Sequence, residues 1–258
     1  MSQEVLEHIN ELESMKKYPN PLYYKGNLEL IKRPKVSIVG SRKALAYTKD
    51  MTYKLSKALS SRGVCIVSGA AMGVDAIAHA GAKADNTIAV VANGLDIRYP
   101  KVNAKLIEDI EDKGLVISQF EDGFRATPWS FVVRNELVVA LGDILVVTQA
   151  SLDSGTMRSV EYALDMQKDI WVIPHRIGDS SGTDMLLNQG LAKPIYDIEK
   201  FASTFGKETT NSIKKDDFYY FIQTSPTFDE AIMKFGDRVY EAELEGILTI
   251  QDGIVRFV

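Results

Sequence analysis

The stretch VSIVGSRKALAY, residues 36–47, decides the fold. It begins as a run of apolar and small residues, typical of a strand buried on both faces. It then turns at Gly40, Ser41 and Arg42 into a helical pattern. A buried strand that leads through a short turn into a helix is the repeating unit of a parallel α/β sheet. The arginine at this turn raises a question, because the chain of 258 residues has a formal net charge of −5.

The same unit recurs along most of the chain. Short runs rich in Val and Ile alternate with helical patterns from residue 35 onward. We expect strands at 36–40, 64–69, 87–93, 115–118, 143–149 and 169–174, and helices at 46–61, 73–83, 103–113, 132–141 and 155–167. The sequence therefore predicts an α/β fold, an extended Rossmann-like, doubly wound, mostly parallel sheet with helices on both faces, over residues 35–206.

Three further segments flank this predicted domain. Residues 1–34 predict a short amphipathic helix followed by the loop YPNPLYYKGN. The apolar face of that helix would consist of Val5, Ile9, Leu12 and Met15. Residues 207–215 are polar and indicate a linker. In residues 216–258, three short helical patterns precede two strands around a Gln-Asp-Gly turn, which predicts a small winged-helix-like module.

The negative charge is concentrated in that last module. Residues 216–258 hold three Lys/Arg and nine Asp/Glu, a balance of −6, so residues 1–215 carry about +1. The expected recognition helix, residues 237–246, has four carboxylates and one arginine, and carboxylates repel phosphates. We therefore interpret the module as a protein-contact module. The overall charge argues against a protein that coats nucleic acid indiscriminately, but leaves room for a local basic cleft in the larger part.

Other features of the composition are those of a cytoplasmic protein. No apolar run is long enough to span a bilayer, and the first residues, MSQEVLEHINELES, lack the apolar region of a secretory signal. The single cysteine, Cys65, lies in a strand-like run and is expected to be a buried thiol. The three histidines have no metal-ligand spacing, so we expect no metal. Because no apolar run could span a bilayer, we also expect no membrane partner.

Three strand-to-helix turns carry small polar residues. They are Gly40-Ser41-Arg42, the run that begins with Ser68, Gly69 and Ala70, and Ser154-Gly155-Thr156. Ligands of doubly wound sheets bind at the carboxyl ends of the strands, and a following helix offers free backbone N–H groups to an anion. The triphosphate signature GxxxxGK[ST] and the dinucleotide signature GxGxxG are both absent. The turns therefore predict a phosphate-binding edge that uses no nucleotide cofactor.

A fourth stretch, TPWSFVVRNELVVA at 127–140, sets an aromatic ring beside a cation. Phe131 and Arg134 are three residues apart and share one face of the expected helix. Single-stranded nucleic acid requires such a combination, because its bases stack on the ring and its backbone meets the charge. The same pattern also fits a core phenylalanine and a surface ion pair. The pattern alone leaves both interpretations open.

At these residues the chain resembles the DNA-processing protein A family, also called DprA or Smf. The matching pieces occur in the family's order and spacing over about residues 35–195. They are VGSR (39–42), SGAAMGVDAIAH (68–79), NGLDIRYP (93–100), SFVVRN (130–135), SGT (154–156), WVIP (171–174) and GTDMLLNQG (182–190).

The resemblance implies a cytoplasmic protein that binds and protects incoming single-stranded DNA during natural transformation. It also implies that the protein helps to load the RecA recombinase, forms a homodimer through the Rossmann-like domain and performs no catalysis. Carried over by position, the residues implied to bind DNA are Gly40, Ser41, Arg42, Ser68, Gly69, Ala70, Phe131, Arg134, Asn135, Ser154, Gly155 and Thr156. In that set Arg42 would meet a phosphate and Phe131 would stack on a base.

This chain departs from the family's pattern in the fourth stretch. The family usually has R-N-R where this chain has Arg134, Asn135 and Glu136, so one cation is lost. Some members place a basic residue ahead of the phenylalanine, where this chain has Pro128 and Trp129. Trp129 would be either a second stacking ring or a packed side chain.

Three further residues of the matching motifs are polar but receive structural assignments. Asp75 and Asp96 are expected to cap a helix or to bond loop amides, because a carboxylate beside phosphates would weaken binding. His79 is expected to be a core histidine.

Two alternatives remain open at this stage. Related Rossmann-like enzymes that cleave nucleoside monophosphates carry P-G-G-x-G-T-x-x-E, and the glutamate is needed for the reaction. Here the turn lacks the paired glycines, position 159 is serine, and Glu161 is displaced along the helix. The other alternative is a scaffold that acts mainly through protein contacts, which the acidic module favours.

Overall fold

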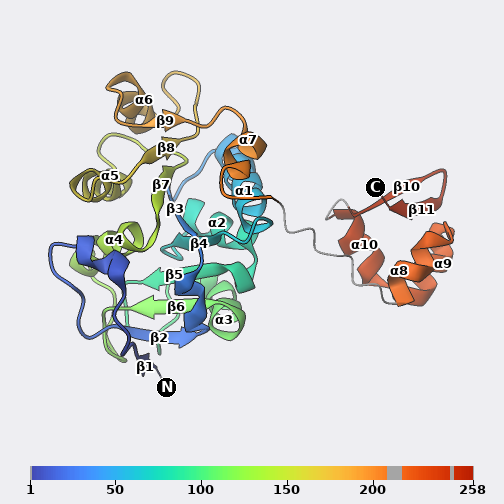
Figure 1. Cartoon of the computed structure of the whole chain (residues 1–258), viewed down its shortest axis with the longest axis horizontal. Helices are drawn as coiled ribbons and strands as arrows, with labels where there is room; N and C mark the ends of the chain where they lie inside the picture. Colours follow the sequence, from blue (N-terminus) through green and yellow to red (C-terminus); the bar gives the residue numbers. More distant parts are fainter. Residues whose placement is uncertain (1, 208–216, 245–246, 258) are drawn as a thin grey trace. The chain divides into compact units, whose positions relative to one another are not determined.

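The computed structural model describes residues 2–207, 217–244 and 247–257 (Figure 1). The chain divides into two compact units, Met1–Glu208 and Thr209–Val258. Apart from Lys207, the predicted linker at 207–215 lies outside the described residues, and the predicted division into four segments stays a prediction. Within the described ranges, no helix is both long enough and apolar enough to cross a bilayer.

The large unit is built on one sheet. In the described part of the chain its strand order is β1-β2-β6-β5-β4-β3-β7-β8-β9. The strands expected from the sequence are β3 (Lys35–Val39), β4 (Cys65–Ser68), β5 (Thr87–Val91), β6 (Leu115–Ser118), β7 (Ile144–Val147) and β8 (Ile170–Val172). Each pairs in parallel with its neighbours among these six. The predicted α/β fold with a mostly parallel sheet is confirmed.

The order of the strands reverses beside β3. The chain proceeds outward from β3 through β4 and β5 to β6, then returns to the other side of β3 with β7 and continues to β8. Such a switch point leaves a crevice at the carboxyl ends of the two diverging strands, and doubly wound proteins bind their ligands there. The turn after β3 and the turn after β7 both belong to the predicted phosphate-binding edge.

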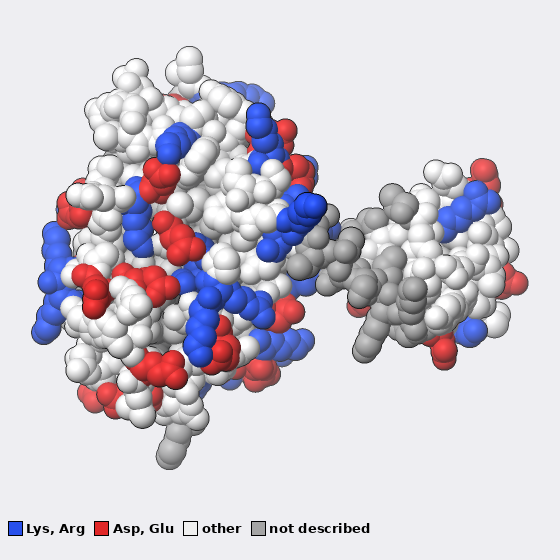
Figure 2. Space-filling view, viewed as in Figure 1, with Lys and Arg blue, Asp and Glu red and all other residues white. Residues whose placement is uncertain are grey.

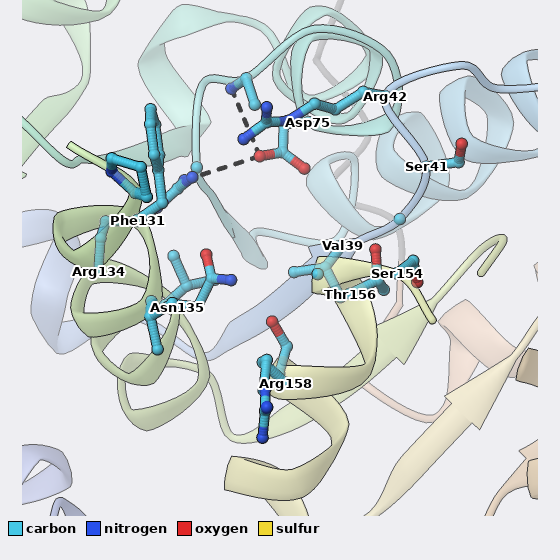
Figure 3. Close-up of a pocket in the computed structure, with 18 residues that line it drawn as sticks. Val39, Ser41, Arg42, Asp75, Phe131, Arg134, Asn135, Ser154, Thr156 and Arg158 are labelled. Atoms are coloured by element: carbon cyan, nitrogen blue, oxygen red, sulfur yellow. Dashed lines mark hydrogen bonds and ion pairs between the residues drawn. The ribbon is translucent and has the colours of Figure 1, made fainter. Parts of the chain in front are cut away.

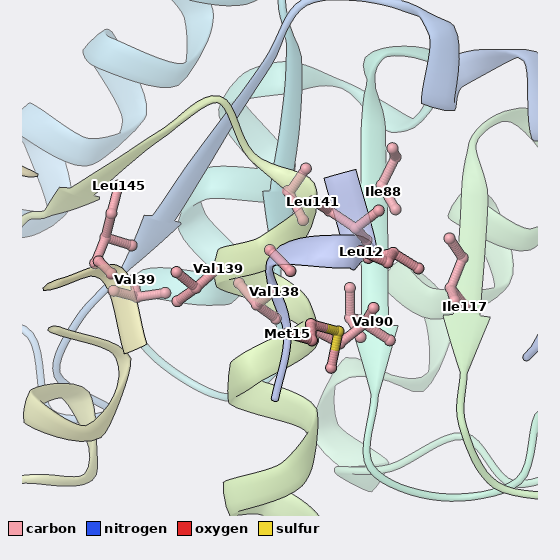
Figure 4. Packing of buried hydrophobic residues seen from close by; sticks show 14 of the residues in the cluster. Leu12, Met15, Val39, Ile88, Val90, Ile117, Val138, Val139, Leu141 and Leu145 are labelled. Carbon is pink, nitrogen blue, oxygen red and sulfur yellow. The ribbon is translucent and has the colours of Figure 1, made fainter. Parts of the chain in front are cut away.

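Helices cover both faces of the sheet (Figure 1). One face packs against α1 (Ala46–Ser60), α2 (Val74–Ala82), α3 (Ala104–Lys113) and α7 (Ile198–Ser203). The other packs against α4 (Pro128–Leu141), α5 (Gly155–Asp165) and α6 (Ser181–Asn188). Side chains of β3 alternate between the two cores, since Val36 and Ile38 pack with the first group. Val39 packs with the second group (Figure 4). Burial on both faces explains the continuous apolar runs of the sequence.

Helix α4 begins earlier than the sequence pattern predicts. The expected start was residue 132, whereas the helix begins at Pro128. The Thr127 hydroxyl accepts a hydrogen bond from the Ser130 amide, the Ser130 hydroxyl accepts one from the Thr127 amide, and proline is favourable in the first helical position. This reciprocal cap adds a first turn, so that Phe131 lies within the helix.

The N-terminal segment differs from its prediction. The expected α-helix is wrong, because the segment forms β1 (Gln3–Glu4) and the 3₁₀-helix η1 (Asn10–Ser14). Of the predicted apolar face, Ile9, Leu12 and Met15 are buried and Val5 is half-buried. Leu12 and Met15 pack against α4 and the sheet (Figure 4). Of the four residues of the predicted apolar face, only Leu12 lies within η1, and Ile9 and Met15 flank it. The expected loop contains β2 (Tyr23–Gly26), which pairs with β6 in antiparallel fashion.

Shorter elements complete the large unit. They are the 3₁₀-helices η2 (Leu28–Lys32), η3 (Ala84–Asn86) and η4 (Lys101–Asn103) and the edge strand β9 (Lys193–Pro194). On the face drawn in Figure 2, basic and acidic side chains are interspersed over this unit.

Unit 2 has its own core. Its described residues form α8 (Asp217–Gln223), α9 (Phe228–Phe235), α10 (Asp237–Leu244) and the antiparallel pair β10 (Leu248–Gln251) and β11 (Ile254–Phe257). Side chains from all five elements pack together. This order of elements agrees with the expected one, and the winged-helix assignment itself stays a prediction. Two residues of the predicted recognition helix, at 245–246, lie outside the described residues.

Candidate functional site

A cleft of about 600 Å³ opens at the switch point of the large unit (Figure 3). The three turns predicted from the sequence meet there with the first turns of α4. The predicted site residues that line it are Gly40, Ser41, Arg42, Gly69, Phe131, Arg134, Asn135, Ser154, Gly155 and Thr156. The fold thus brings together residues from four separate parts of the chain.

In the turn after β3, the backbone is fixed by contacts with neighbouring segments, and the side chain of Arg42 is exposed to solvent. The Ser41 amide donates to the Gln149 carbonyl at 2.9 Å, which joins this turn to the end of β7. A Cβ on Gly40 would lie 2.7 Å from the Cγ2 of Val74, so the position admits only glycine without displacement. Arg42 is exposed, and its guanidinium lies 5.2 Å from the centre of the Phe131 ring. Among the described residues it has no ion-pair partner.

Two predicted site residues lie behind the cleft wall. Ser68 and Ala70 are fully buried and do not line the cleft. The Ser68 hydroxyl donates to the Ile38 carbonyl at 2.7 Å, and the Ala70 amide donates to Nε2 of His79 at 3.3 Å. Both residues shape the loop after β4, and only Gly69 from this trio lines the cleft, so a contact of Ser68 or Ala70 with DNA stays a prediction.

The floor of the cleft contains a buried ion pair. Arg134 is 4% exposed, and its Nη1 lies 3.7 Å from Oδ2 of Asp75 and donates to the Val90 carbonyl at 3.2 Å. A side chain on Gly69 would collide with this guanidinium, so glycine is required beside it. Burial raises the pKa of the Asp75 carboxyl, and the positive charge of Arg134 opposes that rise. Of the two sequence-based interpretations, the ion pair is present, but it is buried and not at the surface.

Asp75 also holds the loop that precedes α2. Its Oδ2 accepts a hydrogen bond from the Ala71 amide at 3.4 Å, which confirms the expectation that this carboxylate bonds a loop amide. Asp96 behaves in the same way, since its Oδ1 accepts from the Gly123 amide at 2.7 Å. The pairing of Asp75 with Arg134 was not foreseen, because the two residues are distant in sequence.

Phe131 lies at the rim of the cleft. Its ring is half-buried, 6.1 Å from the Tyr99 ring and tilted by 45° to it. A core phenylalanine would be enclosed, so that interpretation is wrong for this residue. Trp129 is 63% exposed and meets Phe120 edge-on at 5.9 Å, so it is both exposed and packed on one side.

The start of α5 forms the opposite wall. The Ser154 hydroxyl donates to the Ser151 carbonyl at 2.7 Å, and the first amides of the helix have no carbonyl within the helix to bond. Arg158 also lines the cleft and was missed by the sequence analysis. It pairs with Glu161 at 2.7 Å, and a pair three residues apart looks like an ordinary solvated helix face in a sequence.

Two polar or titratable residues near the cleft are structural. His79 is fully buried, and burial lowers its pKa to about 3, as expected for a core histidine. Glu136 turns away from the cleft, since its Oε1 accepts a hydrogen bond from the Lys16 amide at 2.9 Å. The glutamate that replaces a cation of the family's pattern therefore anchors the N-terminal segment to α4.

The buried thiol of Cys65 is confirmed as well. Burial raises the pKa of this thiol to about 12, so the group is protonated at neutral pH. Within the described residues, no cluster of His, Cys, Asp and Glu could hold a metal ion.

The chemistry of the cleft suits an anion. Among the described residues that line it, Asp75 alone has a carboxylate, and that carboxylate is buried and paired. Glu161 does not line the cleft, and Ser159 occupies the helix position where nucleoside-monophosphate glycosidases carry their glutamate. Backbone amides, hydroxyls, the Asn135 carboxamide and two exposed guanidinium groups also line the cleft.

Comparisons with known proteins identify the family of this chain. The family model described as DNA recombination-mediator protein A matches residues 6–206. The chain belongs to this family. DNA processing protein DprA of Streptococcus pneumoniae is 37% identical over 176 residues, which are 67% of this chain and 62% of that protein. Protein Smf of Synechocystis is 34% identical over 193 residues, which are 72% of this chain and 48% of that protein. The chain thus matches about half to two thirds of the length of these curated relatives.

Solved structures of relatives share the fold. DNA processing protein A from Helicobacter pylori, which was described for its single-stranded DNA binding mode, superposes with a TM-score of 0.77 at 38% identity. That match covers 79% of this chain and 94% of the other. The Streptococcus pneumoniae structure gives a TM-score of 0.73 at 33% identity and covers 80% of this chain and 75% of the other. The Rossmann-like architecture of the large unit is therefore that of DNA processing protein A.

Proposed function

We propose that the cleft binds single-stranded DNA by its sugar–phosphate backbone. The observation that carries this proposal is the position of Arg42. It is exposed, unpaired among the described residues, and set against Phe131 where three strand-to-helix turns meet. The proposal gives a role to the arginine in the opening stretch. The cation serves a local anion site in a chain that is acidic overall.

The contacts expected of a phosphate are available on both walls. Arg42 would pair with one phosphate, and the amides at the start of α5 would donate to it or to its neighbour. Arg158 stands on the α5 wall, where its pair with Glu161 is exposed and therefore weak. A phosphate could compete for Arg158 at small cost. The small residues Gly155 and Thr156 leave room for a backbone to approach.

The ring of Phe131 favours a single strand. A base stacks on a protein ring only when it is splayed away from its partner, and a duplex hides the faces of its bases. The Helicobacter pylori relative, described for single-stranded DNA binding, supports the same preference. We infer that Phe131 stacks on a base while Arg42 holds the adjoining phosphate.

We further propose the cellular role of the family for this chain. It would protect incoming single-stranded DNA during natural transformation and help to load the RecA recombinase, as a cytoplasmic homodimer without catalytic activity. The family membership and the paired state of Asp75 support a binding protein over a glycosidase. The acidic unit 2 would contact a protein partner, because its charge repels phosphates.

The direct test is fluorescence anisotropy with a labelled oligo-dT of a few tens of nucleotides. The parent chain should bind it more tightly than a duplex of the same length. Arg42→Ala should weaken binding about tenfold or more, whereas Lys200→Ala, which removes an exposed cation of α7 outside the cleft, should bind like the parent. Equal affinity of the parent for the two oligonucleotides, or no loss in Arg42→Ala, would contradict the proposal.

The role with RecA needs its own measurement. Purified chain and RecA should co-purify, and RecA should assemble faster on oligo-dT that the chain has already bound. Co-purification with RecA by a chain that shows no DNA binding would instead favour the scaffold alternative.

A further inference from the structure

A shallow notch lies beside the cleft, on the other side of Phe131. It measures about 30 Å³ and shares Arg42, Gly69, Ala71 and Phe131 with the cleft. Its other lining residues are Met72, Ala92, Asn93, Tyr99 and Pro100. The notch is too small to enclose a nucleobase, so a base would lie over its mouth against the exposed side chains. Phe131 thus forms a partition between two adjoining surfaces.

Two large side chains at the mouth of the notch face solvent. Tyr99 is 50% exposed and Met72 is 49% exposed. An exposed ring beside a thioether offers a flat, polarisable surface, and such surfaces attract the faces of bases. Tyr99 belongs to the motif NGLDIRYP, for which the proposed function assigns no role.

The loop that carries Tyr99 is held rigidly. The Asn93 side chain, which is 1% exposed, donates from Nδ2 to the carbonyls of Gly94 and Ile97 at 2.9 and 2.5 Å. Asp96 bonds the Gly123 amide across the loop at 2.7 Å.

The residue next to Tyr99 is also anchored. Arg98 pairs with Glu108 and Glu111 of α3 at 3.1 and 2.7 Å. A platform fixed before the ligand arrives loses little conformational entropy on binding, which favours affinity. The loop therefore holds the Tyr99 ring in place before DNA binds, and the DNA does not have to order it.

We propose that Tyr99 is a second base-stacking platform, which receives the nucleotide next to the one held at Phe131. This proposal rests on the proposed function and extends its binding site. Arg42 lines both the cleft and the notch, so a phosphate at its guanidinium would join a nucleotide on each side of Phe131. The 6.1 Å between the two ring centres places the platforms within reach of neighbouring bases of one strand.

The experiment uses the full chain and oligo-dT. Tyr99→Leu keeps apolar volume but removes the ring, and it should weaken binding by about 5- to 150-fold, the range for one stacked base. Tyr99→Phe keeps the ring and should bind like the parent. Tyr196→Ala, which removes an 84% exposed tyrosine outside both surfaces, serves as the matched control and should also bind like the parent.

A second readout is independent of affinity. Oligonucleotides in which thymine is replaced by 5-iodouracil form crosslinks with aromatic side chains under ultraviolet light, and the crosslinked peptide is identified by mass spectrometry. We expect crosslinks at both Phe131 and Tyr99, with the second lost in Tyr99→Leu.

The outcomes separate this inference from the proposed function. If Arg42→Ala loses affinity while Tyr99→Leu binds like Tyr196→Ala and no crosslink forms at Tyr99, the second platform is refuted and the proposed function stands. If Arg42→Ala also binds like the parent, both are refuted.

Discussion

The floor and the rim of the cleft each present an arginine, and the two are placed in opposite environments. Arg134 in the floor is 4% exposed, bonded to Val90 and paired with Asp75. Arg42 at the rim is exposed and rests against an aromatic ring. The buried guanidinium of Arg134 already has protein partners, whereas the exposed guanidinium of Arg42 is accessible to a ligand. From this comparison we propose that charge in the cleft acts on stability where it is buried and on binding where it is exposed.

The largest expected effect comes from the floor. Arg134→Leu should lower the free energy of unfolding by about 3–5 kcal/mol, because it leaves the Asp75 carboxylate buried without a counterion. Adding Asp75→Asn should restore more than half of that loss, since the carboxamide oxygen can still accept from Ala71. Denaturant titrations of the parent and both variants measure this. A single variant as stable as the parent would show that the pair is not a structural element.

The next largest effect belongs to the rim. Phe131→Ala should weaken binding to oligo-dT by about 1–3 kcal/mol, the contribution of one stacked base. The same anisotropy titration measures it, with Tyr196→Ala as the control. If Phe131→Ala instead lowered the free energy of unfolding and left the affinity for oligo-dT unchanged, the ring would be structural, like the residues of the floor. The distinction between a structural floor and a binding rim would then be wrong.

Acid should destabilise the large unit through His79, which is buried near the cleft. Its pKa is lowered to about 3 in the folded chain from an ordinary value of 6.5, because the ring is buried. The unfolded chain therefore binds one more proton than the folded chain between these values, and stability falls as the pH drops below 6.5. The loss from this group should reach about 1.4 kcal/mol at pH 5.5.

The variant His79→Gln isolates that effect. Glutamine has no titrating group, so its free energy of unfolding should fall less steeply between pH 6.5 and 5 than that of the parent. Identical slopes in denaturant titrations across this range would mean that His79 is protonated in the folded chain.

The smallest expected effect concerns the departure from the family's R-N-R pattern. Glu136→Arg restores the missing cation, yet it should change affinity for oligo-dT by less than about twofold, because Glu136 faces Lys16 and not the cleft. It should lower the free energy of unfolding by about 1 kcal/mol through the lost hydrogen bond. A large gain in affinity would place residue 136 on the path of the strand.

The sequence could predict the parts of the fold that depend on local pattern. The six parallel strands were found because burial on both faces gives continuous apolar runs. Strand β2 was missed because it is short and lies in a segment rich in Tyr, Pro and Asn, and because its pairings with β1 and β6 are tertiary contacts. The N-terminal helix was misjudged because apolar residues at helical spacing can also be buried from a short 3₁₀-helix and the segments beside it: of the four residues, only Leu12 lies within η1.

The candidate site shows the same limit. The turns at Gly40, Gly69 and Gly155 were recognisable because strand-to-helix turns rich in small residues are local features. Nothing local indicates that Arg134 would be buried against Asp75, or that Tyr99 would approach Phe131. Both contacts depend on how α4 packs across the carboxyl ends of β4 and β5, and only the assembled sheet determines that.

The salt dependence of binding tests the central claim most directly. We plot the logarithm of the association constant for oligo-dT against the logarithm of the salt concentration, which gives a negative slope. In Arg42→Ala this slope should be less steep by about 0.7, the change for one phosphate contact on a single strand. The slope should be unchanged in the double variant Arg134→Leu with Asp75→Asn. An unchanged slope in Arg42→Ala, or a reduced slope in the double variant, would contradict the assignment of the rim to phosphate and the floor to stability.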